Sequence, residues 1–584
     1  DGNNWFCHNF SLFLLLCFPV MARKVVYHMK HFGIHQNNTD NTAALTKFLQ
    51  SHPPKLGDKD KIVLRFDKGT YNFRLEEAPE IECFISNHDQ QPLRKAVFYL
   101  NHYENLTIDG GGAQFLFQGA LLPIVLNYCE NVTLKNFSID FVDPQIEQVE
   151  IIKSDTTGIR FKLSPFSRNT KDYQWLFTEQ GYFETQGENW RSHFAWGIGF
   201  DKETHHILYN TGDLGINLLN CRQEGEYFYA PNWKDLRLKT GNIVAMRNYN
   251  RPCPAIFLNE SKNTKLQNVT VNYAWGMGLI AQRCTDIILH GFNVYPSNGR
   301  YFSTQADATH FSQCRGKIIS RKGMYEGMMD DAINVHGVYL RILQRKDDHT
   351  AICAFMHSQA YGFNWGNTGD SVRFINSTTL DSVQTNVITA IRPQDAVTLQ
   401  GMKSFLISFR DPIPAEADCI ENLKWTPSIV FSGNTIRNNR ARGALFSSPQ
   451  YTLCEKNLFD HTSGSAILLS GDANGWYESG PVNNIVIRRN RFINALTSRY
   501  QFTNAVISIY PEIPELKNQR NYYHNRISIE NNLFDTFDTP LVYAKSVHHL
   551  IFRNNKLKKN SEFPPFLSNT QPIITEKVEK TTKN

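Results

Sequence analysis

Short apolar runs that end in asparagine recur along this chain at a nearly constant spacing. Asn434 and Asn457 are 23 residues apart, and so are Asn532 and Asn555. The runs are rich in Ile, Val, Leu, Thr and Phe, which favour strands, and asparagine tolerates left-handed turns and can stack in hydrogen-bonded ladders. A unit of this length cannot bury its apolar face alone, so successive units must stack. The repeat therefore predicts an all-β fold, a right-handed parallel β-helix.

A leucine-rich repeat is the competing architecture for a repeat of this length. Its L-x-x-L-x-L framework does not occur here, and no helical half-repeat recurs between the strand-like runs. The β-helix is therefore the preferred prediction.

The segment before the first repeats is predicted to cap one end of the stacked coils. Residues 38–49 have the pattern of a capped amphipathic helix, and residues 62–66 and 68–73 follow it as strand-like runs. This order resembles the cap helix and first coil of pectate-lyase-like β-helix proteins. The resemblance implies that the helix covers the open end of the core.

Two stretches, residues 145–250 and 337–425, lack the asparagine turns and alternate apolar and polar residues like antiparallel strands. We expect them to form two small β-barrels or sandwiches inserted between coils, which could also supply a homodimer interface. The polar, Lys/Thr-rich end of the chain is expected to be frayed. The expected order is a signal-peptide remnant (1–22), cap and first coils (23–144), first barrel (145–250), central coils (251–336), second barrel (337–425), C-terminal coils (426–560) and tail (561–584).

An uncharged apolar run, residues 10–22, precedes Arg23 and Lys24 near the N-terminus. It is too short to span a bilayer and has the length of a signal-peptide core. We therefore expect export to the periplasm or cell surface of a bacterium. A degraded lipoprotein signal around Cys17 and a short core strand are the alternatives.

Charge and cysteine content exclude several classes of partner and site. The net charge of +6 is small for 584 residues, and no basic block stands out before the C-terminal tail, so nucleic acid is not an expected partner. The eleven cysteines include no C-x-x-C pair, which argues against a zinc site or a disulfide framework. Cys129, Cys284, Cys314 and Cys454 sit in apolar runs and are expected to be buried thiols.

Three aspartates between the two insertions carry the chemical signal. Asp307 and Asp330 are 23 residues apart, one repeat unit, so we expect them at equivalent positions on adjacent coils with Asp331 beside them. Stacked carboxyl groups raise at least one pKa, which leaves one protonated while others stay ionised. Glycoside hydrolysis requires such an acid and a carboxylate. Turn capping and calcium binding are the alternatives, although no D-x-D-x-D loop is present.

The order of one aspartate, about twenty residues, and then an Asp-Asp pair is similar to the polygalacturonase family. That resemblance implies that Asp330 is the general acid and that Asp307 and Asp331 position the nucleophilic water. The sequence around Asn334 and His336 echoes another motif of the same family.

Three longer phrases, residues 305–311, 329–337 and 471–480, look like the bacterial α-1,3-galactosidases of glycoside hydrolase family 110. The resemblance covers nearly the whole chain. It implies an exo-acting, inverting hydrolase that releases terminal α-1,3-linked galactose from blood-group-B-type glycans, with neither a metal nor an organic cofactor. A related β-helix glycosidase acting on another galactose-containing polysaccharide is the alternative enzyme. A non-catalytic β-helix glycan-binding protein is the alternative class, and it would not need the three aspartates.

Substrate-binding residues are expected around the three acids. The long turn 471–480 holds an aromatic ring that can stack on a sugar and carboxylates that can bind hydroxyls. Arg283 lies 24 residues before Asp307, about one coil upstream, and is expected to point into the same groove. Packing and turn capping are the alternative roles for these side chains. The candidates are Arg283, His310, Glu326, His336, Asp472, Trp476 and Glu478.

Overall fold

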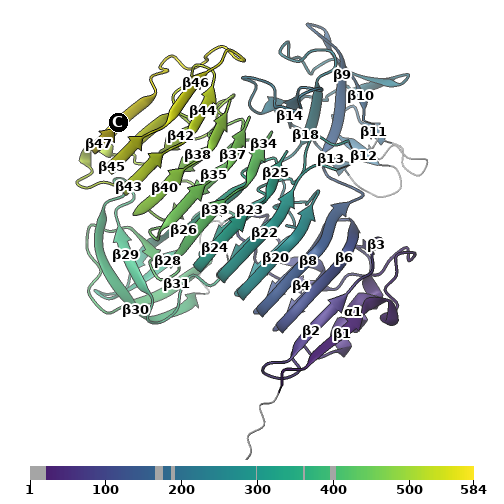
Figure 1. The fold of residues 1–584 in the computed structure, drawn as a ribbon, viewed down its shortest axis with the longest axis horizontal. Coiled ribbons are helices and arrows are strands. Elements are labelled where there is room, and N and C mark those ends of the chain that lie inside the picture. The colour runs from purple at the N-terminus through teal and green to yellow at the C-terminus, as the bar shows by residue number, and fades with distance from the viewer. Residues whose placement is uncertain (1–20, 165–174, 186–190, 298, 360–361, 395–402) are drawn as a thin grey trace, which may run out of the picture.

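The computed structural model describes residues 21–164, 175–185, 191–297, 299–359, 362–394 and 403–584. Most of the expected signal peptide therefore lies outside the described residues. Parallel strands stack from the N-terminal end of the molecule to its C-terminal end, in purple to yellow order in Figure 1, and form one 31-stranded sheet system. The predicted parallel β-helix is confirmed. Among the described residues, no helix has the length and apolar character needed to cross a membrane.

Three ladders of parallel strands make the walls of this β-helix. The ladder that carries the candidate site runs through β19 (Ile256–Asn259), β21 (Leu279–Gln282), β23 (Thr309–Ser312), β26 (Ile333–Val338), β35 (Ala444–Phe446) and β38 (Ile467–Leu469). The second runs through β8 (Glu130–Phe141), β20 (Lys262–Val271), β22 (Thr285–Val294), β24 (Arg315–Arg321), β33 (Pro427–Ser432), β36 (Thr452–Glu455), β40 (Asn484–Arg488) and β43 (His524–Glu530). The third includes β25 (Met324–Glu326), β34 (Thr435–Arg437), β37 (Leu458–Asp460), β41 (Arg491–Ile493) and β44 (Leu533–Thr536).

Alternating burial along each strand supplies the core. In β22, Ile287, Leu289 and Phe292 are buried, whereas the neighbouring Ile288 is 40% exposed. The inward residues of successive coils stack on one another, as Phe459, Phe492 and Phe534 do with ring centroids 5.2 and 4.8 Å apart. Burial of such side chains is the main favourable term in folding, and here one continuous core joins the coils.

A ladder of asparagines ties the turns of the C-terminal coils together. Asn434, Asn457, Asn490 and Asn532 are buried, and the backbone N–H of each donates to the side-chain oxygen of the next rung at 2.9–3.0 Å, ending at Asn555. The side-chain amides also donate to strand carbonyls, so the rungs satisfy both donor and acceptor groups. The residue before each of the five asparagines has a positive φ. The asparagines themselves are therefore required for the hydrogen bonds of their side-chain amides and not for a left-handed backbone.

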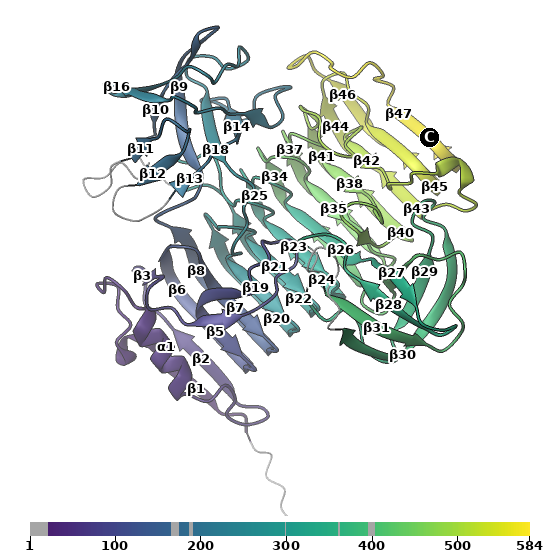
Figure 2. The ribbon, with the colours of Figure 1, turned by 180° about the vertical axis from the view of Figure 1, so that it is seen from behind.

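The N-terminal cap is present as helix α1 (Thr42–Ser51) beside β1 (Lys24–His28) and β2 (Lys61–Arg65) (Figure 2). Leu45 and Phe48 on its inner face are buried in the first coils. The helix begins later than residue 38 because the Asn41 side chain closes a turn, accepting hydrogen bonds from the His35 backbone and the Asn38 amide at 2.9 Å.

Two inserted units interrupt the coils and project from different sides of the stack (Figures 1 and 2). The first follows β8 and is a seven-stranded antiparallel sheet with its own core, and the second follows β26 and is a closed six-stranded barrel. The first comprises β9 (Glu147–Asp155), β10 (Gly158–Leu163), β14 (Trp196–Phe200), β15 (Leu214–Gly215), β16 (Arg222–Glu224), β17 (Tyr227–Ala230) and β18 (Ile243–Arg247). The barrel comprises β27 (Leu340–Arg345), β28 (Thr350–Ala354), β29 (Ser371–Ile375), β30 (Ser382–Gln394), β31 (Ser404–Phe409) and β32 (Cys419–Asn422).

The expectation of a frayed C-terminal tail is wrong. β47 (Ile573–Lys583) pairs in parallel with β45 (Val542–Arg553), and its Ile573 and Val578 pack against the core. The last coil would otherwise leave a row of unpaired backbone groups, and β47 satisfies them. Its lysines and glutamates then discourage pairing with another chain.

The asparagine ladder predicts a local stability difference. Replacing Asn490 by Ala removes the acceptor of Asn457 and the donor to the Cys454 carbonyl, leaving buried groups unpaired. We expect the free energy of unfolding to fall by about 2–4 kcal/mol. Asn525→Ala is the matched control, because Asn525 is exposed and its amide donates only to Asn483 among the described side chains. Denaturant unfolding of the two variants compares the effects, and equal losses would contradict a special role of the ladder.

Candidate active site

The three candidate catalytic aspartates converge at the beginnings of β23 and β26. One carboxylate oxygen from each of Asp307, Asp330 and Asp331 lies within 4.8 Å of the others. They line one open cavity, with side chains from several other segments of the chain around them. Asp307 and Asp331 are almost completely buried, whereas the Asp330 side chain keeps 12% of its surface exposed.

The coil that joins Asp307 to the Asp-Asp pair is slightly longer than the repeat unit. Thr309 pairs with Ile333, and the Ala308 N–H donates to the Asp331 carbonyl at 2.8 Å. Asp307 is therefore level with Asp331, and the expected equivalence of Asp307 and Asp330 is wrong. Asp330 precedes the paired position and lies at the turn, which explains why it is the most exposed of the three.

Asp331 is paired with Arg442. The Arg442 backbone N–H and Nε donate to Asp331 Oδ1 at 3.1 and 3.0 Å, and Nη2 donates to Oδ2 at 3.1 Å. Hydrogen bonds from a permanent cation to both oxygens favour the carboxylate form, whereas burial and the two neighbouring aspartates act to raise the pKa of Asp331 well above its usual range. Arg442 immediately precedes the next strand of the same ladder, β35, and is at the level of Asp331 on the following coil.

Asp330 also lies against cations. Arg251 Nη2 donates to Asp330 Oδ2 at 3.0 Å, and Arg440 Nη1 lies 3.6 Å from Oδ1. Burial acts to raise the pKa of this carboxyl, but Arg440 and Arg251 outweigh it and lower the pKa to about 2. Asp330 is thus ionised across the physiological pH range.

Asp307 is in a different environment, at the end of a chain of two histidines. His336 Nδ1 lies 2.7 Å from the Gly337 carbonyl, which can only accept, so Nδ1 carries a proton and, in the neutral ring, Nε2 has the lone pair. His310 Nε2 lies 2.7 Å from that lone pair and must donate to it. His310 Nδ1, 2.8 Å from Asp307 Oδ2, is then the acceptor when the ring is neutral. The proton in this last hydrogen bond belongs to Asp307.

Electrostatics agree with a neutral His310 ring and a protonated Asp307. Burial lowers the pKa of His310 well below its usual range, so the ring is neutral. Burial, and next the negative charge of Asp330, raise the pKa of Asp307 well above its usual range. The proton is therefore assigned to Asp307, with Asp330 ionised and Asp331 held against the Arg442 guanidinium. The polygalacturonase resemblance implied that Asp330 holds the proton, and the geometry of the free cavity favours Asp307 instead.

The long turn 471–480 forms one wall of the cavity. Asp472 accepts hydrogen bonds from the backbone N–H groups of Asn474, Gly475 and Trp476 at 2.6–2.8 Å, so this carboxylate shapes the turn although it also lines the cavity. The Trp476 ring is stacked on His357, which follows β28 of the inserted barrel, with centroids 4.1 Å apart. An indole fixed in this way offers a flat face to a ligand.

Glu478 reaches the cavity because the turn ends in a short antiparallel strand. β39 (Glu478–Ser479) pairs with Val338 and Gly337 at the end of β26. Glu478 Oε1 is consequently 3.5 Å from His336 Nε2, behind the three aspartates. His310, Asp472, Trp476 and Glu478 thus line the cavity as expected, and His336 lies directly behind His310.

Arg283 is not brought to this cavity. The coil from β21 to β23 is longer than one repeat unit, because Leu279 pairs with Thr309, so Arg283 is level with Gln313 and not with Asp307. Its guanidinium lies 3.7 Å from the centre of the Trp425 ring, in a separate cavity between the coils and the inserted barrel. The extra length of this coil is the reason that the expected alignment of Arg283 with the acids failed.

Glu326 is also outside the cavity. It ends β25, which belongs to the third ladder, and its carboxylate pairs with Arg437 at 3.1 Å. Glu326 is a predicted substrate-binding residue and is only four positions from Asp330 in sequence. A turn between the ladders separates them in space.

Several cavity residues were missed by the sequence analysis. Arg442 could have been recognised from its position, because it lies two residues before a strand, as Asp307 and Asp331 do. The second insertion separates Arg442 from these aspartates in sequence and obscures the correspondence. Arg251 returns from the first insertion, and its backbone N–H is fixed by Asp89 at 2.9 Å, so only the tertiary structure places it. The other residues missed in the lining are Asn87, Asn334, Leu445, Leu468, Ser470, Gln501 and Phe502.

The acids and histidines of the cavity satisfy one another in ways that disfavour a metal ion. The described part of the chain has two groups of possible metal ligands here, the three aspartates and the set His310, His336 and Glu478. Arginine cations already occupy both oxygens of Asp331 and one of Asp330, and the facing nitrogens of the two histidines bond to each other. The arrangement therefore suits acid–base chemistry.

Comparisons with known proteins agree with the architecture. Residues 147–244 match the family model described as GLAA-B beta-barrel domain I, and residues 350–418 match GLAA-B beta-barrel domain II. These ranges cover most of the first inserted unit and of the closed barrel.

Relatives resemble the chain over nearly its full length. It is 49% identical to an alpha-1,3-galactosidase B of Bacteroides fragilis (strain YCH46), with 97% of this chain and 98% of the relative covered. It is 48% identical to an alpha-1,3-galactosidase B of Phocaeicola vulgatus, with 98% of each covered. Among solved structures, the family 28 exopolygalacturonase of Yersinia enterocolitica has a TM-score of 0.42 and 11% identity, covering 96% of this chain and 78% of that one.

The Asp331–Arg442 pair predicts a coupled effect on stability. Arg442→Met leaves the Asp331 carboxylate buried without its cation, and we expect the free energy of unfolding to fall by about 3–5 kcal/mol. The double variant Asp331→Asn with Arg442→Met removes the charge as well and is expected to recover much of the loss. Denaturant unfolding at neutral pH measures both, and simple additivity of the two changes would contradict the pairing.

Proposed function

This chain belongs to the α-1,3-galactosidase B family and is therefore a galactosidase, and we propose that it removes terminal α-1,3-linked galactose from blood-group-B-type glycans in an exo-acting, inverting reaction. The observation that carries the proposal is the trio of aspartates, whose three carboxyl groups meet inside one cavity.

The walls of the cavity support action on a chain end. Asn87 comes from the loop between β4 (Glu80–Glu82) and β5 (Leu93–Asn101), and Arg251 from the return of the first insertion. Trp476 and Phe502 come from long turns of the C-terminal coils. Side chains from separate segments thus surround the acids on several sides. A cavity surrounded in this way can admit the terminal sugar of a chain. Hydrolysis of internal linkages in a polysaccharide needs a groove that is open at both ends.

The protonation states support separate roles for a general acid and a general base. Hydrolysis needs a proton for the leaving oxygen and a carboxylate that removes a proton from the attacking water. In this proposal Asp307 holds the proton at rest, Asp330 is ionised and Asp331 is paired with Arg442. We assign proton donation to Asp307, whose proton must first leave its hydrogen bond with His310, and water activation to Asp330 and Asp331. After the bond to the anomeric carbon breaks, the water proton can return to the trio, which restores its resting state.

Inversion rests on the family resemblance and not on the spacing of the acids. Inverting glycosidases usually separate their two carboxyl groups by about 6.5–9.5 Å and retaining ones by about 5–5.5 Å. The nearest oxygens of the trio are within 4.8 Å. Three carboxyl groups, however, allow two of them to hold a water while the third donates its proton, which a pair at this distance could not do.

Substitution of the aspartates tests the assignment of roles. Asp330→Asn and Asp331→Asn should each reduce kcat by about two to four orders of magnitude on every substrate, because water activation is lost. Asp307→Asn should lose a similar factor on oligosaccharides but much less on an aryl α-galactoside, whose leaving group needs little protonation.

The pH profile supplies the control for this assignment. In the unmodified enzyme, kcat/KM should fall as the pH rises through the elevated pKa of Asp307, because the acid is then deprotonated. With the aryl substrate, Asp307→Asn should lack this alkaline decline. The reverse pattern, with the decline removed by Asp330→Asn, would assign proton donation to Asp330.

Product analysis tests the substrate and the stereochemistry. The enzyme should release free galactose, and no larger sugar, from a linear α-1,3-galactosyl oligosaccharide and from its fucosylated B-type counterpart. NMR during the first turnovers should show β-galactose before the anomers equilibrate. Early α-galactose would mean retention, and hydrolysis of internal α-1,3-galactosyl linkages would contradict the exo-acting mode.

A further inference from the structure

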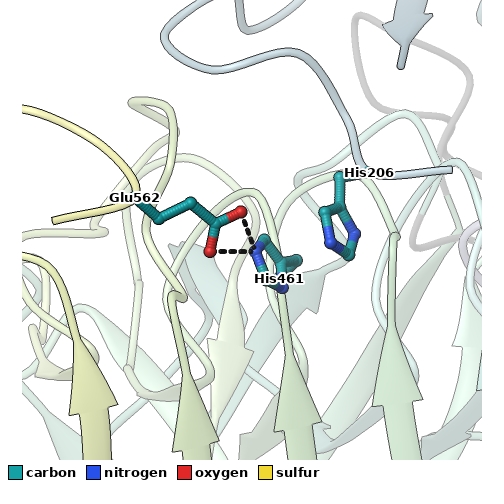
Figure 3. A group of neighbouring side chains, drawn as sticks. All are labelled: His206, His461 and Glu562. Atoms are coloured by element: carbon teal, nitrogen blue, oxygen red, sulfur yellow. Dashed lines mark hydrogen bonds and ion pairs between the residues drawn. The ribbon is translucent and has the colours of Figure 1, made fainter. Parts of the chain in front are cut away.

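A second cluster of histidine and carboxylate side chains lies away from the cavity. His206, His461 and Glu562, here called the His–His–Glu cluster, each offer one ligand atom within 4.8 Å of the other two (Figure 3). None of the three lines the cavity of the aspartates. They come from the first inserted unit, from the turn after β37 and from the segment that follows β46 (Lys556–Lys559).

We propose that the His–His–Glu cluster binds a divalent transition-metal ion of the Zn²⁺ type, which fastens the first inserted unit to the C-terminal coils. Two imidazole nitrogens and a carboxylate form a common donor set for Zn²⁺, and water can complete four-fold coordination. This role is structural and separate from the proposed hydrolysis.

The hydrogen bonds of His206 leave the correct nitrogen free for a metal. The Asn438 amide nitrogen donates to Glu326 Oε1 at 3.2 Å, which turns its oxygen toward His206 Nδ1 at 2.7 Å. An amide oxygen only accepts, so Nδ1 carries the proton and Nε2 has the lone pair. Metal-bound histidines are usually oriented by such a hydrogen bond on the other nitrogen. Glu326, once expected at the substrate site, thus helps to orient this ring.

His461 has the same arrangement with a stronger partner. Its Nδ1 is hydrogen-bonded to the Asp460 carboxylate, and its Nε2 faces both oxygens of Glu562 at 2.9 and 3.0 Å. A carboxylate behind a ligating histidine is a recurrent feature of zinc sites. A metal ion would replace the proton between Nε2 and Glu562, so binding releases one proton when that nitrogen is protonated.

The position of His206 is compatible with a small adjustment toward the metal. Its ring lies parallel to that of His461, with centroids 3.5 Å apart and an angle of 7° between the planes. For both Nε2 lone pairs to converge on one ion, one ring must tilt. An open cavity of about 510 Å³ borders His206, Asn438 and Asp460, so there is room for that rotation and for a water ligand.

A metal at this place would join distant parts of the chain. His461 and Glu562 are far apart in sequence, and His206 belongs to a unit inserted between earlier coils. Cross-links that close long loops are expected to stabilise the folded state by restricting the unfolded chain. The first inserted unit already touches the C-terminal coils here through the paired rings, so the ion would reinforce an existing contact.

Metal titration of the full-length enzyme tests the proposal. Chain stripped with a chelator is titrated with Zn²⁺ by calorimetry and with Co²⁺ by visible absorption. We expect one strong site, a tetrahedral Co²⁺ spectrum and a higher thermal unfolding midpoint with Zn²⁺. His206→Ala and Glu562→Gln should each weaken binding at least about tenfold and abolish the rise in the midpoint.

The controls separate this site from the cavity and from misfolding. His205→Ala alters the neighbouring histidine, whose ring stacks on Tyr301, and should bind Zn²⁺ as the unmodified chain does. Galactosidase activity should be unchanged in His206→Ala and Glu562→Gln, which shows that both variants fold. Absence of a strong site in the unmodified chain, or the same affinity in His206→Ala and Glu562→Gln, would overturn the proposal whether or not the hydrolase assignment stands.

Discussion

Hydrogen bonding between parallel strands of successive coils is the constraint on which the rest of this structure depends. A single coil cannot bury its apolar face, so each strand must pair with the equivalent strand of the next coil. Every residue of a ladder therefore has a fixed height along the axis. Asp307, Asp331 and Arg442 share one position on three successive coils, before β23, β26 and β35. That stacking puts an acid, a carboxylate and a guanidinium together without any long-range motif in the sequence.

The two inserted units complete the site because of where they leave and rejoin the coils. The first departs after β8 and returns before β19, and Arg251 on the return pairs with Asp330. The second departs after β26, and its His357 supports the Trp476 ring. Each insertion has its own core, so its length does not disturb the register of the ladders. The β-helix supplies the aspartates, Arg442 and Trp476, and the insertions add Arg251 and the His357 ring that supports Trp476.

Two errors of the sequence analysis, the alignments of Asp330 and Arg283 with Asp307, share one cause, which is variable coil length. The regular repeat matched Asp307 to Asp330, but this coil is slightly longer than the repeat and the partner is Asp331. The same assumption brought Arg283 to the acids, but that coil is longer still and Arg283 packs on Trp425 instead. The side chains that were placed correctly, such as His310, Trp476 and Glu478, belong to phrases whose local spacing does not depend on coil length. Turn loops can lengthen at little energetic cost, so spacing predicts the fold more reliably than it predicts a contact.

The sequence by itself determined the β-helix, its asparagine-bound turns, the two interruptions and the presence of three acids near one another. Apolar periodicity and turn chemistry act between neighbouring residues and are visible in one dimension. Only the tertiary structure decided which acid bears the proton, because that depends on Arg251, Arg440 and Arg442 approaching from other segments and on two histidines that meet across adjacent strands. Charge interactions depend on distance and burial in three dimensions, and neither can be read from the order of residues along the chain.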